Sequence, residues 1–240
     1  MALPLYLAMT AAEFYHCPVL PQKTAWMACH FSPYGTGLSN CPETLPLDSM
    51  LIINDRTPIA GHDSKQIVKQ LTQMLEQLPI SSVLLDFQRP DTSELFLLTQ
   101  VLTAELPCPV GVSHHYASGC NSPVFLPPAP VNVPLEQYLQ PWSGRELWLE
   151  TALDNLCIEV SQSGVTFQNQ CTSSENPVHR EARLHCRYQI ETDTDAVRFL
   201  LHRTQEDVDT LLADAITLGV TKAIGLYQEL GKKLSEDSNA

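Results

Sequence analysis

Eight short apolar runs constrain the fold of this chain more than any other feature. Most are continuously apolar rather than alternating, which is typical of strands in a parallel sheet covered on both faces. A chain of 240 residues can hold one large α/β domain or two small ones, and eight-stranded barrels often have about this length. We therefore predict a parallel α/β barrel with strands at residues 5–9, 24–29, 50–54, 82–87, 110–113, 124–126, 146–150 and 222–227.

Three amphipathic segments between these runs predict helices. Each keeps apolar residues at helical spacing behind a residue type that caps helices, and these starts are Asp63, Asp91 and Thr204. The third segment also has Asp207 at its third position and a glycine stop at Gly219. Strand followed by helix, repeated along the chain, is the signature of βα units.

The pattern is irregular in two places. Too few residues separate the fifth and sixth strands for a crossover helix. Between residues 155 and 191 the apolar period changes to two, which predicts a hairpin with its turn near Ser161, a third strand at 184–190 and a surface loop at 170–183.

These patterns together define the predicted fold class. We predict an irregular (β/α)8 TIM-type barrel with a small β insertion after the seventh strand. One domain covers residues 1–232, with the insertion at about 155–191, and residues 233–240 form a flexible tail.

Charge and composition exclude several partners. The net charge is −13, from 14 basic and 27 acidic residues, whereas nucleic acids and anionic membrane surfaces bind basic faces. No run reaches the roughly 20 apolar residues that a membrane span needs. No basic leader precedes the apolar N-terminal run, so we expect no signal peptide and a cytoplasmic location.

The eight cysteines are scattered without a C-x-x-C pair, so we expect reduced thiols. Cys29 and His30, taken with Cys17 and Cys41, match no standard zinc spacing. We therefore predict no metal site and no cofactor.

Asp86 and Gln88 lie at the end of the 82–87 run, directly before a predicted helix. Residues two apart on a strand point to the same face, and the carboxyl edge of a parallel barrel is where active sites are built. A carboxylate beside an amide can orient a substrate amide or hold a water. An acid–base pair of carboxyl groups would instead need a carboxylic acid at Gln88.

Other polar residues also fall at predicted strand ends and should converge on the same mouth. Asp55 and Arg56 could clamp an anionic group, or could form an internal ion pair at the barrel rim. Adjacent strand residues face opposite sides, so at most one of His114 and His115 points inward. The strand-end polar residues are His30, Asn54, Asp55, Arg56, Asp86, Gln88, His114, His115, Glu150 and Glu229.

Eight strands, a β insertion after the seventh and an aspartate on the fourth resemble the family-18 glycoside hydrolases, the chitinase group. The fourth strand of that family carries D-x-x-D-x-D-x-E, whose glutamate protonates the glycosidic oxygen while the neighbouring aspartate orients the substrate acetamide. The matching positions here are Ser81, Leu84, Asp86 and Gln88. The resemblance implies that the third aspartate is kept and that an amide replaces the proton donor.

The C-terminal part carries the second half of this resemblance. Residues 192–200, a helix, and then residues 219–231 resemble the last helix and eighth strand of the group. The family's eighth strand supplies a tryptophan floor to the sugar subsite, and Tyr227 occupies that position here. The sixth strand of the family offers a tyrosine and an acid, which residues 124–128 lack.

Three functions stay open. The first is a catalytically degenerate glycoside hydrolase-like barrel that binds an amide-bearing carbohydrate or glycopeptide. The second is a hydrolase with relocated carboxylates, because a buried glutamate can have a raised pKa and act as an acid; its candidates are Asp55, Asp86, Glu150 and Glu229. The third is a scaffold whose mouth is filled by segments 31–47 or 118–134. The predicted ligand-binding residues are Asp86, Gln88, Asp55, Arg56, His114, Tyr227 and Glu229.

Overall fold

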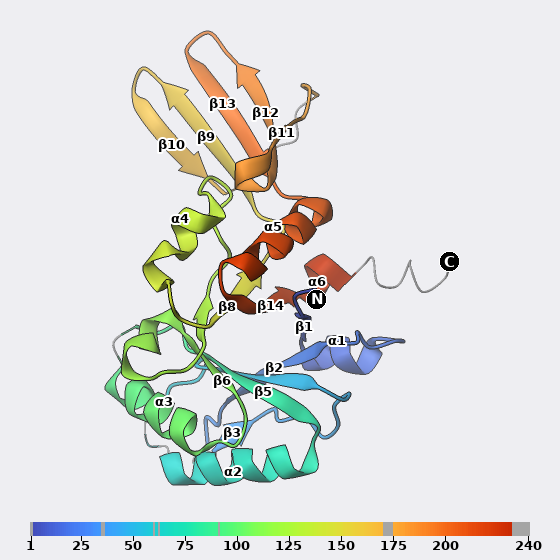
Figure 1. Cartoon of the computed structure of the whole chain (residues 1–240), viewed down its shortest axis with the longest axis vertical. Coiled ribbons are helices and arrows are strands. Elements are labelled where there is room, and N and C mark those ends of the chain that lie inside the picture. The colour runs from blue at the N-terminus through green and yellow to red at the C-terminus, as the bar shows by residue number, and fades with distance from the viewer. Residues whose placement is uncertain are drawn as a thin grey trace.

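The computed structural model describes residues 2–34, 37–59, 61, 63–90, 92–169 and 175–231. Within them, eight parallel strands form a closed barrel, which confirms the predicted fold class (Figure 1). Strand β1 closes it by pairing with both β14 and β2. The barrel strands are β1 (Leu5–Met9), β2 (Thr24–Phe31), β4 (Ser49–Asn54), β5 (Ile80–Asp86), β6 (Val110–Ser113), β7 (Val124–Leu126), β8 (Leu147–Thr151) and β14 (Val220–Leu226). A short strand, β3 (Leu38–Ser39), pairs antiparallel with the end of β2.

The continuous apolar character of these strands follows from burial on both faces. Inward side chains such as Tyr6, Leu84 and Trp148 form a core inside the barrel. Outward side chains pack instead beneath the helices. Gly111 makes room for the Trp148 ring, because a Cβ on this glycine would lie 2.2 Å from it.

The three predicted helices cover the outside of the barrel as α2 (Ser64–Gln77), α3 (Ser93–Glu105) and α5 (Gln205–Thr217). Asp63 caps α2, and the backbone and hydroxyl of Thr204 both donate to the Asp207 carboxylate at the start of α5. Helix α3 begins after Thr92; the predicted cap, Asp91, lies outside the described residues.

Short helical segments fill the remaining connections. A 3-10 helix (His114–Gly119) joins β6 to β7, where the sequence left no room for a crossover helix. The other short segments are α1 (Ala11–His16), α4 (Leu135–Leu139), α6 (Tyr227–Leu230) and the 3-10 turns Gln140–Trp142 and Ala182–Leu184.

A five-stranded antiparallel sheet is inserted between β8 and β14 and stands away from the barrel beyond α4 and α5 (Figure 1). The predicted hairpin is present, with Val165 opposite Val160. The sheet continues past residue 191, because residues 196–202 form a strand that pairs antiparallel with the strands at 155–161 and 186–192. Its strands are β9 (Asn155–Ser161), β10 (Gly164–Gln168), β11 (His179–Glu181), β12 (Cys186–Thr192) and β13 (Ala196–His202).

The segment predicted as a surface loop, 170–183, contains strand β11, which pairs with β12. Residues 170–174 of it and the predicted tail, 233–240, lie outside the described residues. No helix among the residues that the structure describes is long and apolar enough to cross a membrane.

Arg203 fastens the inserted sheet to the barrel. Its buried guanidinium donates to the carbonyls of Pro130, Leu184 and His185, at 3.2 to 3.3 Å, and also to that of Ala129. These acceptors belong to the loop after β7 and to the turn before β12, so one side chain ties the two parts together.

Candidate functional site

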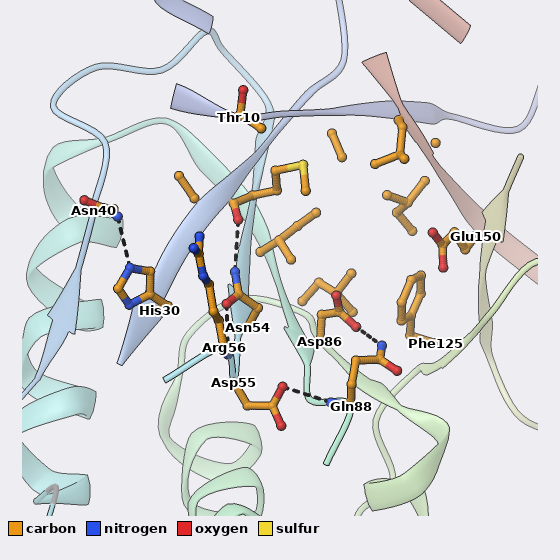
Figure 2. A pocket seen from close by; sticks show the side chains of 18 residues that line it. Thr10, His30, Asn40, Asn54, Asp55, Arg56, Asp86, Gln88, Phe125 and Glu150 are labelled. Atoms are coloured by element: carbon orange, nitrogen blue, oxygen red, sulfur yellow. Dashed lines mark hydrogen bonds between the residues drawn. The ribbon is translucent and has the colours of Figure 1, made fainter. Parts of the chain in front are cut away.

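A cavity of about 580 Å³ opens at the carboxyl ends of the barrel strands (Figure 2). Its base is apolar, formed by side chains such as Ile52, Leu84 and Ile224 from three of the strands. Polar side chains stand above this base at the strand ends. The polar lining residues are Thr10, His30, Asn40, Asn54, Asp55, Arg56, Asp86, Gln88 and Glu150.

Asp86 and Gln88 both line the cavity, in the predicted same-face arrangement. The Gln88 side-chain amide donates a hydrogen bond to the Asp86 carboxylate (Figure 2). Burial raises the pKa of Asp86; the bond from Gln88 opposes the rise, and the charge of Asp55 adds to it. The pair therefore presents one carboxylate and one oriented amide to a ligand.

Asp55 holds this corner together. Its carboxylate is 6% exposed and accepts hydrogen bonds from the backbone N–H groups of Gln88, at 3.1 Å, and Arg89, at 2.8 Å. Among the described residues it makes no ion pair with Arg56, so the predicted ion pair at the rim is replaced by two backbone contacts. Through these backbone hydrogen bonds Asp55 fixes the main chain at Gln88 and therefore the position of the Gln88 Cα atom.

Arg56 contributes a guanidinium to the cavity wall. Its side chain is exposed and extends between His30 and Asn54 in Figure 2. Its backbone carbonyl accepts a bond of 3.0 Å from the Arg89 guanidinium, which ties the loop after β4 to the loop after β5. The Arg56 charge is therefore placed on the β4 side of the mouth.

Glu150 lines the opposite wall, at the end of β8, and is half-buried. Burial raises its pKa to about 7, and the negative charges of Asp86 and Glu229 add to the rise. A carboxyl group with this pKa carries a proton in a large fraction of molecules at neutral pH. Glu150 can therefore give up a proton near pH 7.

His30 and Asn40 form the rim beside Arg56. The Asn40 amide nitrogen lies 3.0 Å from His30 Nε2, and His30 Nδ1 lies 2.8 Å from the Phe31 carbonyl. Asn40 was missed from the sequence because only the pairing of β3 with β2 brings it to the mouth. Phe125 was also missed; as the middle residue of a three-residue strand it points inward, and this alternation was the available signal.

His114 is not among the cavity-lining residues. The strand ends at Ser113, and His114 begins the following 3-10 helix. Its ring stacks on that of His115, with centroids 3.9 Å apart, and meets the edge of Trp142. The two rings therefore lie on the same side of the chain, whereas a strand would have separated them.

Tyr227 and Glu229 also lie outside the cavity lining, because β14 ends at Leu226 and both residues belong to α6. The Tyr227 hydroxyl lies 3.2 Å from the Cys17 sulfur, and Glu229 accepts a bond of 3.2 Å from the Leu153 backbone. At the place where the resemblance implied a tyrosine floor, the cavity is bounded by Gly225 and Leu226.

The described residues contain no cluster of three or more histidine, cysteine, aspartate or glutamate side chains suited to a metal ion. The site offers acceptors at Asp86, donors at Gln88 and Arg56, and the aromatic side chain of Phe125. This combination can exchange hydrogen bonds with a polar ligand.

The sequence matches no protein-family model and no curated protein. Solved structures of similar shape include the spore cortex-lytic enzyme SleL from Bacillus cereus, with a TM-score of 0.58 and 11% identity over 93% of this chain and 70% of that one.

Two plant structures are similar over nearly their whole length. A chitinase-like agglutinin from Robinia pseudoacacia has a TM-score of 0.58 and 11% identity, covering 92% of this chain and 93% of that one. A family-18 chitinase from Cycas revoluta has a TM-score of 0.58 and 10% identity, covering 93% and 94%; it is a double mutant with a glutamate-to-glutamine exchange, in complex with (GlcNAc)4. At such low identity these similarities establish a fold shared with family-18 chitinases and chitinase-like proteins.

Proposed function

We propose that this protein binds an amide-bearing carbohydrate or glycopeptide in the barrel mouth and does not cleave it by the family-18 mechanism. The observation that carries the proposal is the pairing of Asp86 with Gln88 in the cavity. Asp86 keeps the carboxylate that would accept an acetamide N–H. Gln88 stands where the resemblance expects the proton donor, and a neutral amide does not release a proton usefully at physiological pH.

The cavity suits a ligand of this class. Its volume of about 580 Å³ falls within the range of small-molecule sites. Asn54 and Asn40 can exchange hydrogen bonds with sugar hydroxyls, while Phe125 and the apolar base can contact the carbon face of a sugar ring. The Cycas revoluta chitinase is in complex with (GlcNAc)4 although one of its glutamates is replaced by glutamine, which supports sugar binding by a barrel of this fold.

The scaffold alternative predicted a mouth filled by segments 31–47 or 118–134. Among the described residues, these segments contribute Asn40 and Phe125 to the lining and leave the cavity open. This favours a ligand over a relic site.

A second candidate function, hydrolysis with a relocated acid, rests on Glu150. Its pKa of about 7 suits a general acid, and it faces the same cavity as Asp86. Turnover of a chromogenic N-acetylglucosamine oligomer, lost in Glu150→Gln, would move this candidate to first place.

The test of the proposal compares two neutral oligomers of equal length. Calorimetry should detect binding of (GlcNAc)4 and at least tenfold weaker binding of cellotetraose, which has hydroxyls in place of the acetamido groups. Asp86→Ala should weaken (GlcNAc)4 binding by roughly tenfold to a hundredfold, since it removes a charged hydrogen-bond acceptor.

The matched control is Glu105→Ala, an exposed carboxylate at the end of α3, which should leave the affinity unchanged. Equal affinities for the two oligomers, or unchanged binding in Asp86→Ala, would contradict amide recognition.

A further inference from the structure

Two thiols lie directly behind the rim of the cavity. Cys29 is on β2 and fully buried; Cys41 follows β3 and is half-buried. Their sulfur atoms are 3.9 Å apart. Each is the chain neighbour of a rim residue, since Cys29 precedes His30 and Cys41 follows Asn40.

We propose that Cys29 and Cys41 form a reversible disulfide that fastens the segment carrying Asn40 to barrel strand β2. The proposal concerns the protein's own thiols and does not depend on the nature of the ligand.

Hydrogen bonds hold the segment that carries Cys41 beside β2. The Gln70 side chain donates to the Cys41 sulfur at 3.5 Å and exchanges two hydrogen bonds with the backbone of Leu38. The Trp26 indole donates to the Asn40 carbonyl at 2.8 Å. A disulfide needs a sulfur separation of about 2.05 Å, so the two sulfurs must approach by roughly 1.9 Å.

The two thiols differ in pKa and in accessibility, as do the attacking and the resolving cysteine of a thiol–disulfide exchange. The hydrogen bond from Cys29 lowers the pKa of Cys41, although burial opposes this, and Cys41 is the more accessible of the two. The same contact, together with burial, raises the pKa of Cys29 well above its ordinary value. Thiolate character and access favour Cys41 as the first thiol to react.

Glutathione disulfide serves as the oxidant. The Cys41 thiolate attacks one sulfur of glutathione disulfide, whose S–S bond breaks and releases one glutathione. Cys29 then attacks the Cys41 sulfur of this mixed disulfide and releases the second glutathione. Two protein thiols are oxidised, one glutathione disulfide is reduced, and the thiol protons end on the two glutathiones released.

The Cys29–Cys41 disulfide would restrict the two rim residues, His30 and Asn40, because each is the chain neighbour of one of the cysteines. Asn40 lies 3.0 Å from His30, and both line the cavity. A covalent link between the residues that flank this pair restricts the separation of Asn40 from His30. Oxidation should therefore order the β2 side of the mouth.

The test uses the full-length protein, without carbohydrate, equilibrated in buffers of defined ratio of glutathione to glutathione disulfide. Remaining thiols are alkylated, and peptides are mapped by mass spectrometry without reduction. We expect one cross-linked species joining Cys29 to Cys41, fully reversed by dithiothreitol.

Variants assign the roles. Cys41→Ser should abolish the cross-link, and Cys29→Ala should leave a glutathione adduct on Cys41. The matched control, Cys108→Ser, alters a half-buried thiol elsewhere and should cross-link like the wild type. Wild-type protein that keeps the Cys41 adduct unresolved, or that cross-links only when denatured, would overturn the proposal. Because no carbohydrate is present, this outcome is separate from a failure of the binding proposal.

Discussion

The carboxyl groups on the two walls of the cavity differ in their hydrogen bonding and in their electrostatic surroundings. On the β4–β5 side, Asp55 accepts two backbone hydrogen bonds and Asp86 accepts one from Gln88. On the β8 side, the Glu150 carboxyl group makes no hydrogen bond to the described residues, and the negative charges of Asp86 and Glu229 add to the rise in its pKa. The carboxylates of the first wall are held by hydrogen bonds and can position a ligand. The carboxyl group of the second wall can hold a proton near pH 7 but is not oriented by a hydrogen bond to the described residues.

The largest expected effect is the loss of stability when the hydrogen bonds of Asp55 on the first wall are removed. Asp55→Ala removes the buried carboxylate that accepts from the backbone N–H groups of Gln88 and Arg89, and we expect a loss of roughly 4 kcal/mol of unfolding free energy, from about 1.5–3 kcal/mol per hydrogen bond to a charged group. Urea denaturation measures this. Glu105→Ala, the exposed control, should change it by less than about 0.5 kcal/mol. A comparable loss of unfolding free energy in both variants would contradict the role of Asp55 in positioning the backbone at Gln88.

The second wall predicts a pH dependence. Because folding raises the pKa of Glu150 from 4.5 to about 7, ionisation of Glu150 costs the folded state, and stability falls as the pH rises through this window. At about 1.4 kcal/mol per pKa unit, the contribution is on the order of 3 kcal/mol.

Glu150→Gln should remove this loss. Relative to wild type, the variant should gain stability between about pH 4.5 and about pH 8, as urea midpoints at each pH would measure. A constant difference between the two proteins across this range would mean that Glu150 titrates normally.

The smallest expected effect is weak hydrolytic activity in a variant that has a second carboxyl group beside Asp86 on the first wall. Gln88→Glu puts a carboxyl group beside Asp86, and two such groups repel when both are ionised, so one keeps its proton to higher pH. We expect at most weak turnover of a chromogenic substrate, because misplacement alone can cost about 100-fold. Gln100→Glu, on the exposed face of α3, is the matched control and should give none.

The difference between the walls also explains what the sequence could predict. Asp86 and Gln88 were predictable because a two-residue period at a strand end fixes their common face. Glu150 was predicted from its place at the carboxyl end of an apolar strand. Local pattern was sufficient for these three polar residues, whereas Phe125, which also belongs to a barrel strand, was missed.

Tyr227 and His114 show where local pattern fails. Each follows the last residue of its strand, and one residue past the end the chain turns into a helix and carries the side chain away from the mouth. Asn40 is the opposite case: it was not predicted to bind a ligand, but the long-range pairing of β3 with β2 brings this residue into the site. The extent of the inserted sheet similarly depended on pairings between strands far apart in the sequence.

The most direct test of the central claim follows (GlcNAc)4 and the protein in one sample by NMR. We predict that the backbone signals of Asp86 and Gln88 shift on addition of the oligomer, and that the oligomer stays intact through prolonged incubation near pH 7. Release of shorter oligomers, abolished in Glu150→Gln, would contradict the claim by showing that the second wall supplies the acid. Unshifted signals at millimolar oligomer would contradict carbohydrate binding itself.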